Sequence, residues 1–170
     1  APPTPGAGVW THMYGTPDNS GYGGETLSNI RSNDRLALQW IGRPGPRYQS
    51  DRGNRKPSPL AVSGRLYMQG LNRLIGVDAY NGSLLWALEL PEMQRFNMPR
   101  DTSNWCADDD RIYVVGPRLL VIEGATGEVV RTQEVPSLER DRDDYEWGYV
   151  ARTGKHLVGS AVRKGSTHTG

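Results

Sequence analysis

Two apolar runs flank an Asn-Gly pair in the stretch from Ile75 to Pro91, which reads IGVDAYNGSLLWALELP. β-Prone runs separated by Asn-Gly are typical of a β-hairpin, and Gly82 can take the positive φ that such a tight turn needs. Asp78 precedes the turn, where its short carboxylate can accept hydrogen bonds from the backbone N–H groups that follow. The hairpin explains Asp78 and Gly82 but gives no role to Trp86.

The same pattern recurs along the chain. Ser63–Pro91 aligns with Asp109–Pro136 with one gap, and a third copy begins at Thr153–Val162. An incomplete earlier copy ends at Arg35–Gly42. The period of about 45 residues, built from short strands and turns, predicts propeller blades with one four-stranded antiparallel sheet per repeat. The strands expected in the first clear blade are Arg65–Gly70, Leu74–Ala79 and Leu84–Glu89, with the remaining strand before or after them.

The repeat makes specific predictions about equivalent positions. Gly82 and Gly127 are expected in equivalent turns with φ above zero, with the carboxylates of Asp78 and Glu123 directed back at those turns. Trp86 is expected to be buried, because an indole removes a large apolar area from water and its N–H can reach a carbonyl of an adjacent turn.

The repeats resemble the pyrroloquinoline quinone (PQQ)-like propeller family, whose pattern is A-x-D-x-x-T-G-x-x-x-W. Five positions of the first copy correspond to this pattern: Gly76, Asp78, Asn81, Gly82 and Trp86. The second copy keeps the turn but loses the tryptophan, and its residues are Val121, Glu123, Thr126, Gly127 and Arg131. Trp10 and Gly15 in a lead-in segment, and Trp40 in the place of Trp86, extend the resemblance.

The resemblance implies that the tryptophan of one blade docks flat between neighbouring blades as a structural feature. Arg131 at the matching position is then expected to reach solvent or an acid.

The expected fold is all-β: a partial β-propeller of about three to four antiparallel four-stranded blades with PQQ-like repeats. Residues 1–9 are expected to be a flexible lead, and residues 10–170 the propeller segment, with repeats near 10–60, 63–108, 109–152 and an incomplete one at 153–170. Because closed propellers need more blades, the terminal faces around Leu36–Trp40 and Leu157–Val162 are expected to pack on further blades or on partner subunits.

Composition agrees with short strands and many turns, because the 170 residues include 36% hydrophobic residues, 21 Gly and 12 Pro. No apolar run is long enough to predict a transmembrane segment. The 20 basic and 19 acidic residues are interspersed and give a net charge of +1, so nucleic acid is not an expected partner. The small-residue, Pro-rich start and the family resemblance predict a periplasmic or otherwise extracytoplasmic location, with membrane association through partners as one possibility.

No catalytic or metal-binding residue can be assigned. Quinoproteins of this family hold PQQ with calcium at the hub, under a lid made by two adjacent cysteines. This chain has the single Cys106, and the calcium ligands match no residues here. No cofactor is therefore predicted for the chain alone, and PQQ with calcium is expected only if further blades are present. His12, His156 and His168 are scattered without metal spacing, and the acidic runs at Asp108–Asp110 and Glu139–Trp147 are expected to be solvated turns and linkers.

The long connection from Glu92 to Trp105 is the candidate interaction surface. It carries Phe96, Met98 and Trp105, and exposed Met and aromatic residues make adaptable contacts. The alternative is that Phe96 and Trp105 plug the loop onto its own blade. The sequence thus predicts a scaffold or protein-interaction segment of a larger propeller or multi-subunit assembly. The alternative function is a fragment of a PQQ-dependent oxidoreductase whose site lies mostly outside this chain.

Overall fold

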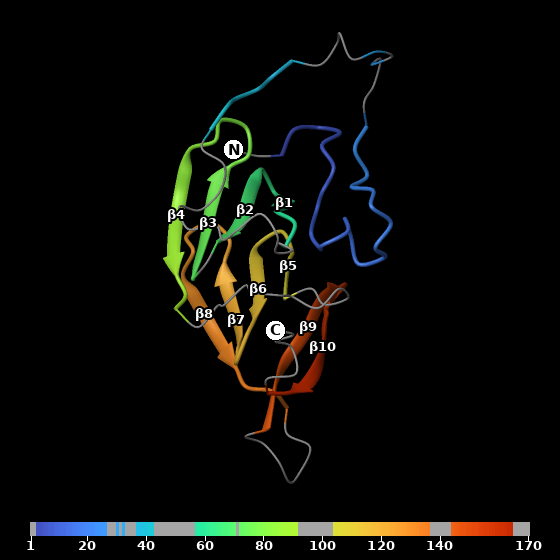
Figure 1. The fold of residues 1–170 in the computed structure, drawn as a ribbon. Helices are drawn as coiled ribbons and strands as arrows, with labels where there is room; N and C mark the ends of the chain where they lie inside the picture. The colour runs from blue at the N-terminus through green and yellow to red at the C-terminus, as the bar shows by residue number, and fades with distance from the viewer. Residues whose placement is uncertain are drawn as a thin grey trace, which may run out of the picture.

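The chain folds as a partial β-propeller, whose described residues form two four-stranded antiparallel sheets and a two-stranded one (Figure 1). The computed structural model describes residues 3–26, 30, 32, 37–42, 57–70, 72–91, 104–136 and 144–164. Within these residues there is no helix. None of the described elements is a helix long and apolar enough to span a membrane.

The three sheets, called blades 1 to 3, follow one another along the chain. Blade 1 has the order β1-β2-β3-β4, with β1 at Leu60–Val62, β2 at Arg65–Gly70, β3 at Arg73–Asp78 and β4 at Leu84–Glu89. Blade 2 has the order β5-β6-β7-β8, with β5 at Trp105–Ala107, β6 at Arg111–Val115, β7 at Leu119–Glu123 and β8 at Val129–Gln133. Blade 3 pairs β9 (Tyr145–Thr153) with β10 (His156–Arg163).

The boundaries of the sequence repeat do not coincide with the boundaries of the sheets. The strand that completes each sheet, β1 or β5, lies just before the aligned segment, so a unit drawn from residue 63 ends with the first strand of the following blade. Residues 10–60 form no complete blade among their described residues, which contain only isolated bridges such as Trp10 with Ala61.

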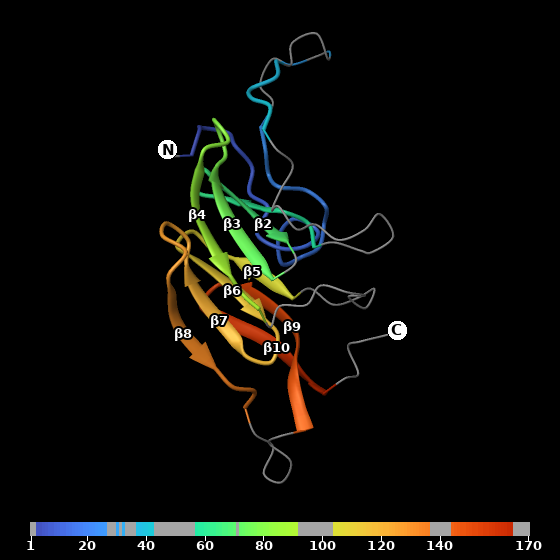
Figure 2. The ribbon, with the colours of Figure 1, turned by 60° about the vertical axis from the view of Figure 1, so that its left-hand side comes forward.

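Alternation along the strands directs side chains to both faces of each sheet, and the faces between neighbouring blades form two cores. Figure 2 shows the sheets stacked face to face. The core between blades 1 and 2 combines ten buried residues: Leu60, Val62, Tyr67, Leu74, Trp86, Trp105, Ala107, Ile112, Val114 and Ile122. The core between blades 2 and 3 combines Cys106, Tyr113, Val115, Leu119, Val121 and Val150. A blade is therefore stabilised mainly by its neighbours.

The hairpin turns of blades 1 and 2 have equivalent backbones. Gly82 and Gly127 have φ of 72° and 76°, and each donates its N–H to the carbonyl four residues earlier, Asp78 or Glu123. The Asp78 carboxylate accepts bonds from the N–H groups of Tyr80 and Asn81 at 2.8 and 3.1 Å. The direction of the Glu123 carboxylate stays a prediction.

Trp86 connects blade 1 to the turn of blade 2, an arrangement that we call the tryptophan joint. Its side chain is 8% exposed, and its Nε1–H donates to the Gly124 carbonyl at 2.9 Å. The indole lies on Gly127 so closely that a Cβ there would be 2.6 Å from Cδ2. Only a residue without a side chain can therefore serve at this turn, for both φ and contact.

We expect Gly127→Ala to destabilise the protein much more than Gly154→Ala. Both glycines have positive φ, but a Cβ on Gly154 would meet nothing within 4 Å. The control should cost roughly 1 kcal/mol for its left-handed backbone, whereas displacement of Trp86 should bring the cost at Gly127 to about 3 kcal/mol. Urea unfolding of both variants measures the difference, and equal losses would show that the contact with the indole contributes nothing.

Candidate functional site

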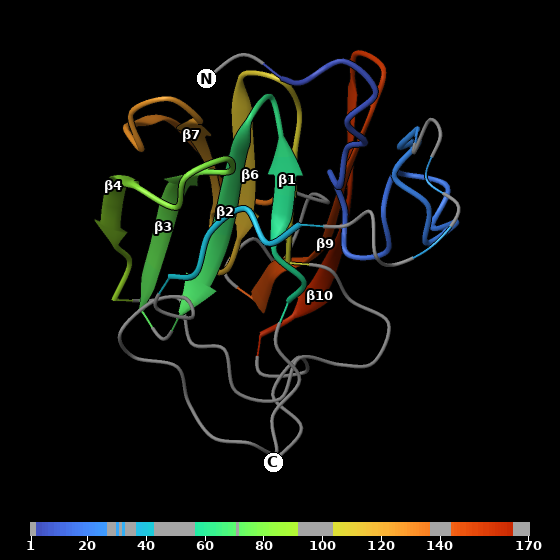
Figure 3. The same cartoon turned by 90° about the horizontal axis from the view of Figure 1, so that it is seen from above.

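The N-terminal segment Trp10–His12 lies along the first strands of all three blades. Trp10 exchanges backbone hydrogen bonds with Ala61 of β1, and the Thr11 carbonyl accepts from Ala107 N of β5 at 2.9 Å. His12 Nε2 accepts from Arg152 N of β9, also at 2.9 Å. Three consecutive residues thus bind three successive blades. Figure 3 shows the dark blue N-terminal part of the chain running beside β1 and β9.

Asp108, directly after β5, is the centre of a polar cluster beside this segment. Its Oδ1 accepts from the N–H groups of Asp110 and Arg111, at 3.1 and 2.8 Å. Its Oδ2 accepts from the Tyr113 hydroxyl at 2.8 Å and from Arg152 Nε at 3.1 Å. Burial opposes ionisation of Asp108, but these four hydrogen bonds outweigh it and place its pKa below the ordinary value. A carboxylate with its lone pairs occupied in this way is a poor general base.

His12 is the second titratable group of the cluster. It is 3% exposed, and burial lowers its pKa. Its Nδ1 lies 2.8 Å from the Thr11 hydroxyl, while Nε2 must be unprotonated to accept the Arg152 N–H. The neutral imidazole is thus part of the backbone connection between the N-terminus and blade 3.

These groups have little capacity for catalysis. Burial raises the pKa of the Cys106 thiol to about 12, so it is not a nucleophile at neutral pH. Among the described residues no three His, Cys, Asp or Glu side chains are grouped to hold a metal ion. We call Trp10–His12, Asp108 and Arg152 together the inner clamp. Their hydrogen bonds connect the first strands of blades 1 to 3.

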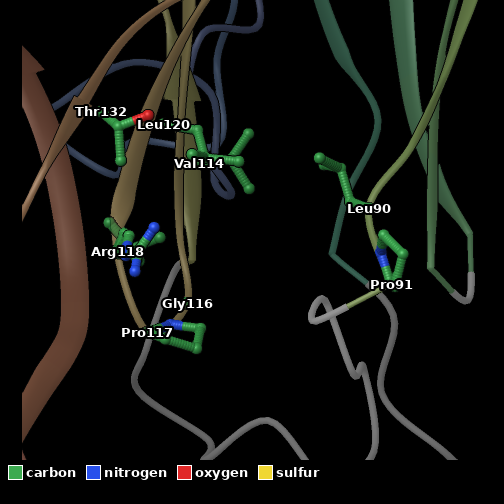
Figure 4. Close-up of a pocket in the computed structure, with 9 residues that line it drawn as sticks. Leu90, Pro91, Val114, Gly116, Pro117, Arg118, Leu120 and Thr132 are labelled. Carbon is green, nitrogen blue, oxygen red and sulfur yellow. The ribbon is translucent and has the colours of Figure 1, made fainter.

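A hollow of about 270 Å³ opens between blades 1 and 2 on another side of the molecule. In Figure 4, Leu90 and Pro91 face Val114, Leu120 and Arg118 across this space. The lining is mostly apolar, and Arg118 is paired with Glu134 at 2.9 Å. It contains no group suited to acid–base or nucleophilic chemistry.

Of the three residues of the predicted interaction surface, the structure describes Trp105 alone. Phe96 and Met98 lie outside the described residues. Trp105 is the first residue of β5 and is 0% exposed in the core between blades 1 and 2, so its indole is not part of an accessible surface. Because β5 pairs with β6, the side chain of Trp105 faces the core between blades 1 and 2. The sequence placed Trp105 at the end of a loop and did not indicate this strand.

Two further expectations concern single residues. Arg131 is exposed and donates to Gln133 Oε1 at 3.0 Å, which fits a position that has lost its tryptophan.

The sequence predicts a solvated acidic turn at Asp108. The turn is present, but the Asp108 carboxylate accepts hydrogen bonds from Tyr113 and Arg152. Its place directly after an apolar strand was the available signal. His12 gave none, because its partner is 140 residues away.

Comparison with known proteins gives similarity at the level of structure. No family model matches the chain, and no curated protein sequence matches it. Quinohemoprotein alcohol dehydrogenase ADHIIG from Pseudomonas putida HK5 is similar with a TM-score of 0.58 and 20% identity, over 92% of this chain and 23% of the enzyme. BamB from Moraxella catarrhalis is similar with a TM-score of 0.45 and 15% identity, over 66% of this chain and 32% of BamB. The chain thus has a PQQ-type propeller fold and spans less than a third of the length of either protein.

We expect the stability of the protein to fall as the pH drops below about 6.5, the ordinary pKa of histidine. The pKa of His12 is lower in the folded state than in the unfolded state, so the unfolded state takes up the proton first. The contribution of neutral His12 is complete above the unfolded pKa and is lost as the pH falls toward the folded one. Urea midpoints between pH 5 and 8 measure this slope.

His12→Gln is the control, because its Oε1 can accept the Arg152 N–H but does not titrate in this range. The variant should show a flatter profile. An unchanged slope would assign the pH dependence to other groups.

We expect Asp108→Asn to cost roughly 2 kcal/mol, because an amide loses the charge-assisted bonds from Tyr113 and Arg152. Asp110→Asn makes the same charge change on an exposed residue of the same turn and should be close to neutral. Chemical denaturation compares the two, and similar losses would mean that general charge, not this cluster, is responsible.

Proposed function

We propose that this chain is an extracytoplasmic propeller segment that acts as a scaffold or protein-interaction module within a larger propeller or multi-subunit assembly. The observation that supports this is the incompleteness of the row of blades at both ends. Propeller blades bury both faces of their sheets against neighbours, and here neither terminal blade has a neighbour on its outer side among the described residues.

Each end leaves apolar side chains in contact with water. At the start, Leu38 and Ile41 are 74% and 84% exposed. At the other end, the described residues of blade 3 form two strands in place of four, none of them pairs with β10 except β9, and Val158 is 50% exposed. Unpaired strand edges and apolar groups together favour association with further polypeptide.

A second candidate function follows from the similarity to the alcohol dehydrogenase. In this view the chain is part of a PQQ-dependent oxidoreductase, and the residues that hold the quinone and calcium lie mostly outside it. Addition of PQQ and calcium, followed by the quinone absorbance, distinguishes the two functions. A spectral change that saturates at one equivalent would favour the oxidoreductase.

We expect the isolated 170-residue chain to form dimers or larger species in size-exclusion chromatography with light scattering. Val158→Lys should reduce this association, because it places a charge at the open end. Val130→Lys, at a 45% exposed position of a complete sheet, is the matched control. A stable, cooperatively unfolding monomer would contradict the proposed function.

A further inference from the structure

Residues 37–42 make a second tryptophan joint, although they belong to no sheet among the described residues. Trp40 Nε1 donates to the Ala79 carbonyl at 2.9 Å, just as Trp86 donates to Gly124. Trp40 also lies on Gly82, where a Cβ would be 2.6 Å from its Cε3. Ala79 and Gly82 occupy in blade 1 the positions of Gly124 and Gly127 in blade 2. Trp40 therefore makes the same contacts with the turn of blade 1 as Trp86 makes with the turn of blade 2.

The equivalence places residues 37–42 at the position of an outermost strand. In blade 1 the tryptophan-bearing strand β4 pairs with β3, which comes directly before it in sequence. Residues 3–26 do not supply such a strand for Trp40, because they form no strand and their Trp10–His12 segment is bound at the first strands of the blades. Residues 37–42 thus lie where an outermost strand would lie, and no described strand pairs with them.

The blades also indicate which residue must lie opposite the tryptophan. In blade 1, Gly76 is the cross-strand partner of Trp86, and a Cβ on Gly76 would be 2.5 Å from the indole Cε2. In blade 2, where Arg131 replaces the tryptophan, its partner is Val121. In blade 1 the glycine leaves room for the tryptophan, and in blade 2 both are absent. The alanine at this position of the family pattern indicates that the residue opposite the tryptophan must be small.

Blade 1 has an apolar face for the rest of such a sheet. The pairs Leu66–Val77 and Met68–Ile75 lie directly opposite each other across β2 and β3, so they share one face. Their counterparts in blade 2 are Ile112–Ile122 and Val114–Leu120, which pack against blade 1. The face of blade 1 turned away from blade 2 therefore repeats the surface on which a preceding blade packs.

We propose that residues 37–42 are the outermost strand of a further blade, and that they pair with an antiparallel strand carrying a small residue, such as the glycine of blade 1, opposite Trp40. The inference rests on the proposed function and specifies its partner: the inner strands of a blade of this same repeat type, supplied from outside the described residues. Such a blade has the small residue at the matching position, as blade 1 has Gly76 opposite Trp86.

Register-specific disulfide formation tests this pairing. The probe is a synthetic peptide with the sequence of residues 72–81, NRLIGVDAYN, which contains the strand that faces Trp86 in blade 1. By analogy with β4, Ile41 and Leu38 should lie opposite the Ile75 and Val77 positions of the peptide. Chain variants Ile41→Cys and Leu38→Cys are each incubated with peptides in which Ile75 or Val77 is replaced by Cys. Both chain positions are exposed, and the native Cys106 is buried.

We expect the two matched combinations to cross-link about tenfold faster than the two mismatched ones, because diagonal positions exceed the Cβ separation of a disulfide. A Gly76→Val change in the peptide should abolish the difference. Equal rates in matched and mismatched pairs, or equal rates with the Gly76→Val peptide, would overturn the inference.

The outcome is separable from that of light scattering. A monomeric chain that still cross-links in register would contradict the proposed function and keep the strand assignment. An associating chain without register preference would do the reverse.

Discussion

The contact of an indole with a bare turn backbone determines how successive blades are placed. Trp40 and Trp86 each combine one N–H bond to a carbonyl with contact over a glycine of positive φ, and burial of such a side chain contributes roughly 2–3 kcal/mol. Because the indole ring lies directly on the backbone of the turn glycine, its thickness determines the distance between the tryptophan-bearing segment and the turn of the next blade. Where Arg131 replaces the tryptophan, blades 2 and 3 are joined differently: Trp147 of β9 reaches back to the Gln133 carbonyl at 3.2 Å.

Local signals explain what sequence alone could predict. Asn81-Gly82 and Thr126-Gly127 mark the hairpin turns, and the apolar runs beside them give strands within a residue or so of β2, β3 and β4. The inner clamp was not predictable in the same way. His12, Asp108 and Arg152 are far apart in sequence and meet only because three blades bring β1, β5 and β9 side by side. The sequence left open whether Trp105 is accessible or packed on its blade, because its burial depends on a neighbouring sheet and not on its own loop.

The polar groups at the inner ends of the blades stabilise the structure more than they offer chemistry. The Asp108 carboxylate is occupied on both oxygens, His12 is held neutral, and Cys106 is buried beneath them. The fold resembles that of a quinohemoprotein enzyme of which it spans 23%. In this chain, however, His12 and Asp108 make hydrogen bonds that connect neighbouring sheets. Among the described residues, Leu38, Ile41 and Val158 remain exposed at the two ends of the row of blades.

The N-terminal segment has a consequence for the order of folding. Residues 10–12 are synthesised before their partners Ala61, Ala107 and Arg152, the last of which lies 140 residues further on. Closing loops of this length is entropically costly and slows folding, whereas each hairpin needs only local contacts. The hairpins should therefore form before residues 10–12 dock, and this docking is the late, long-range step that converts a string of hairpins into one cooperative unit.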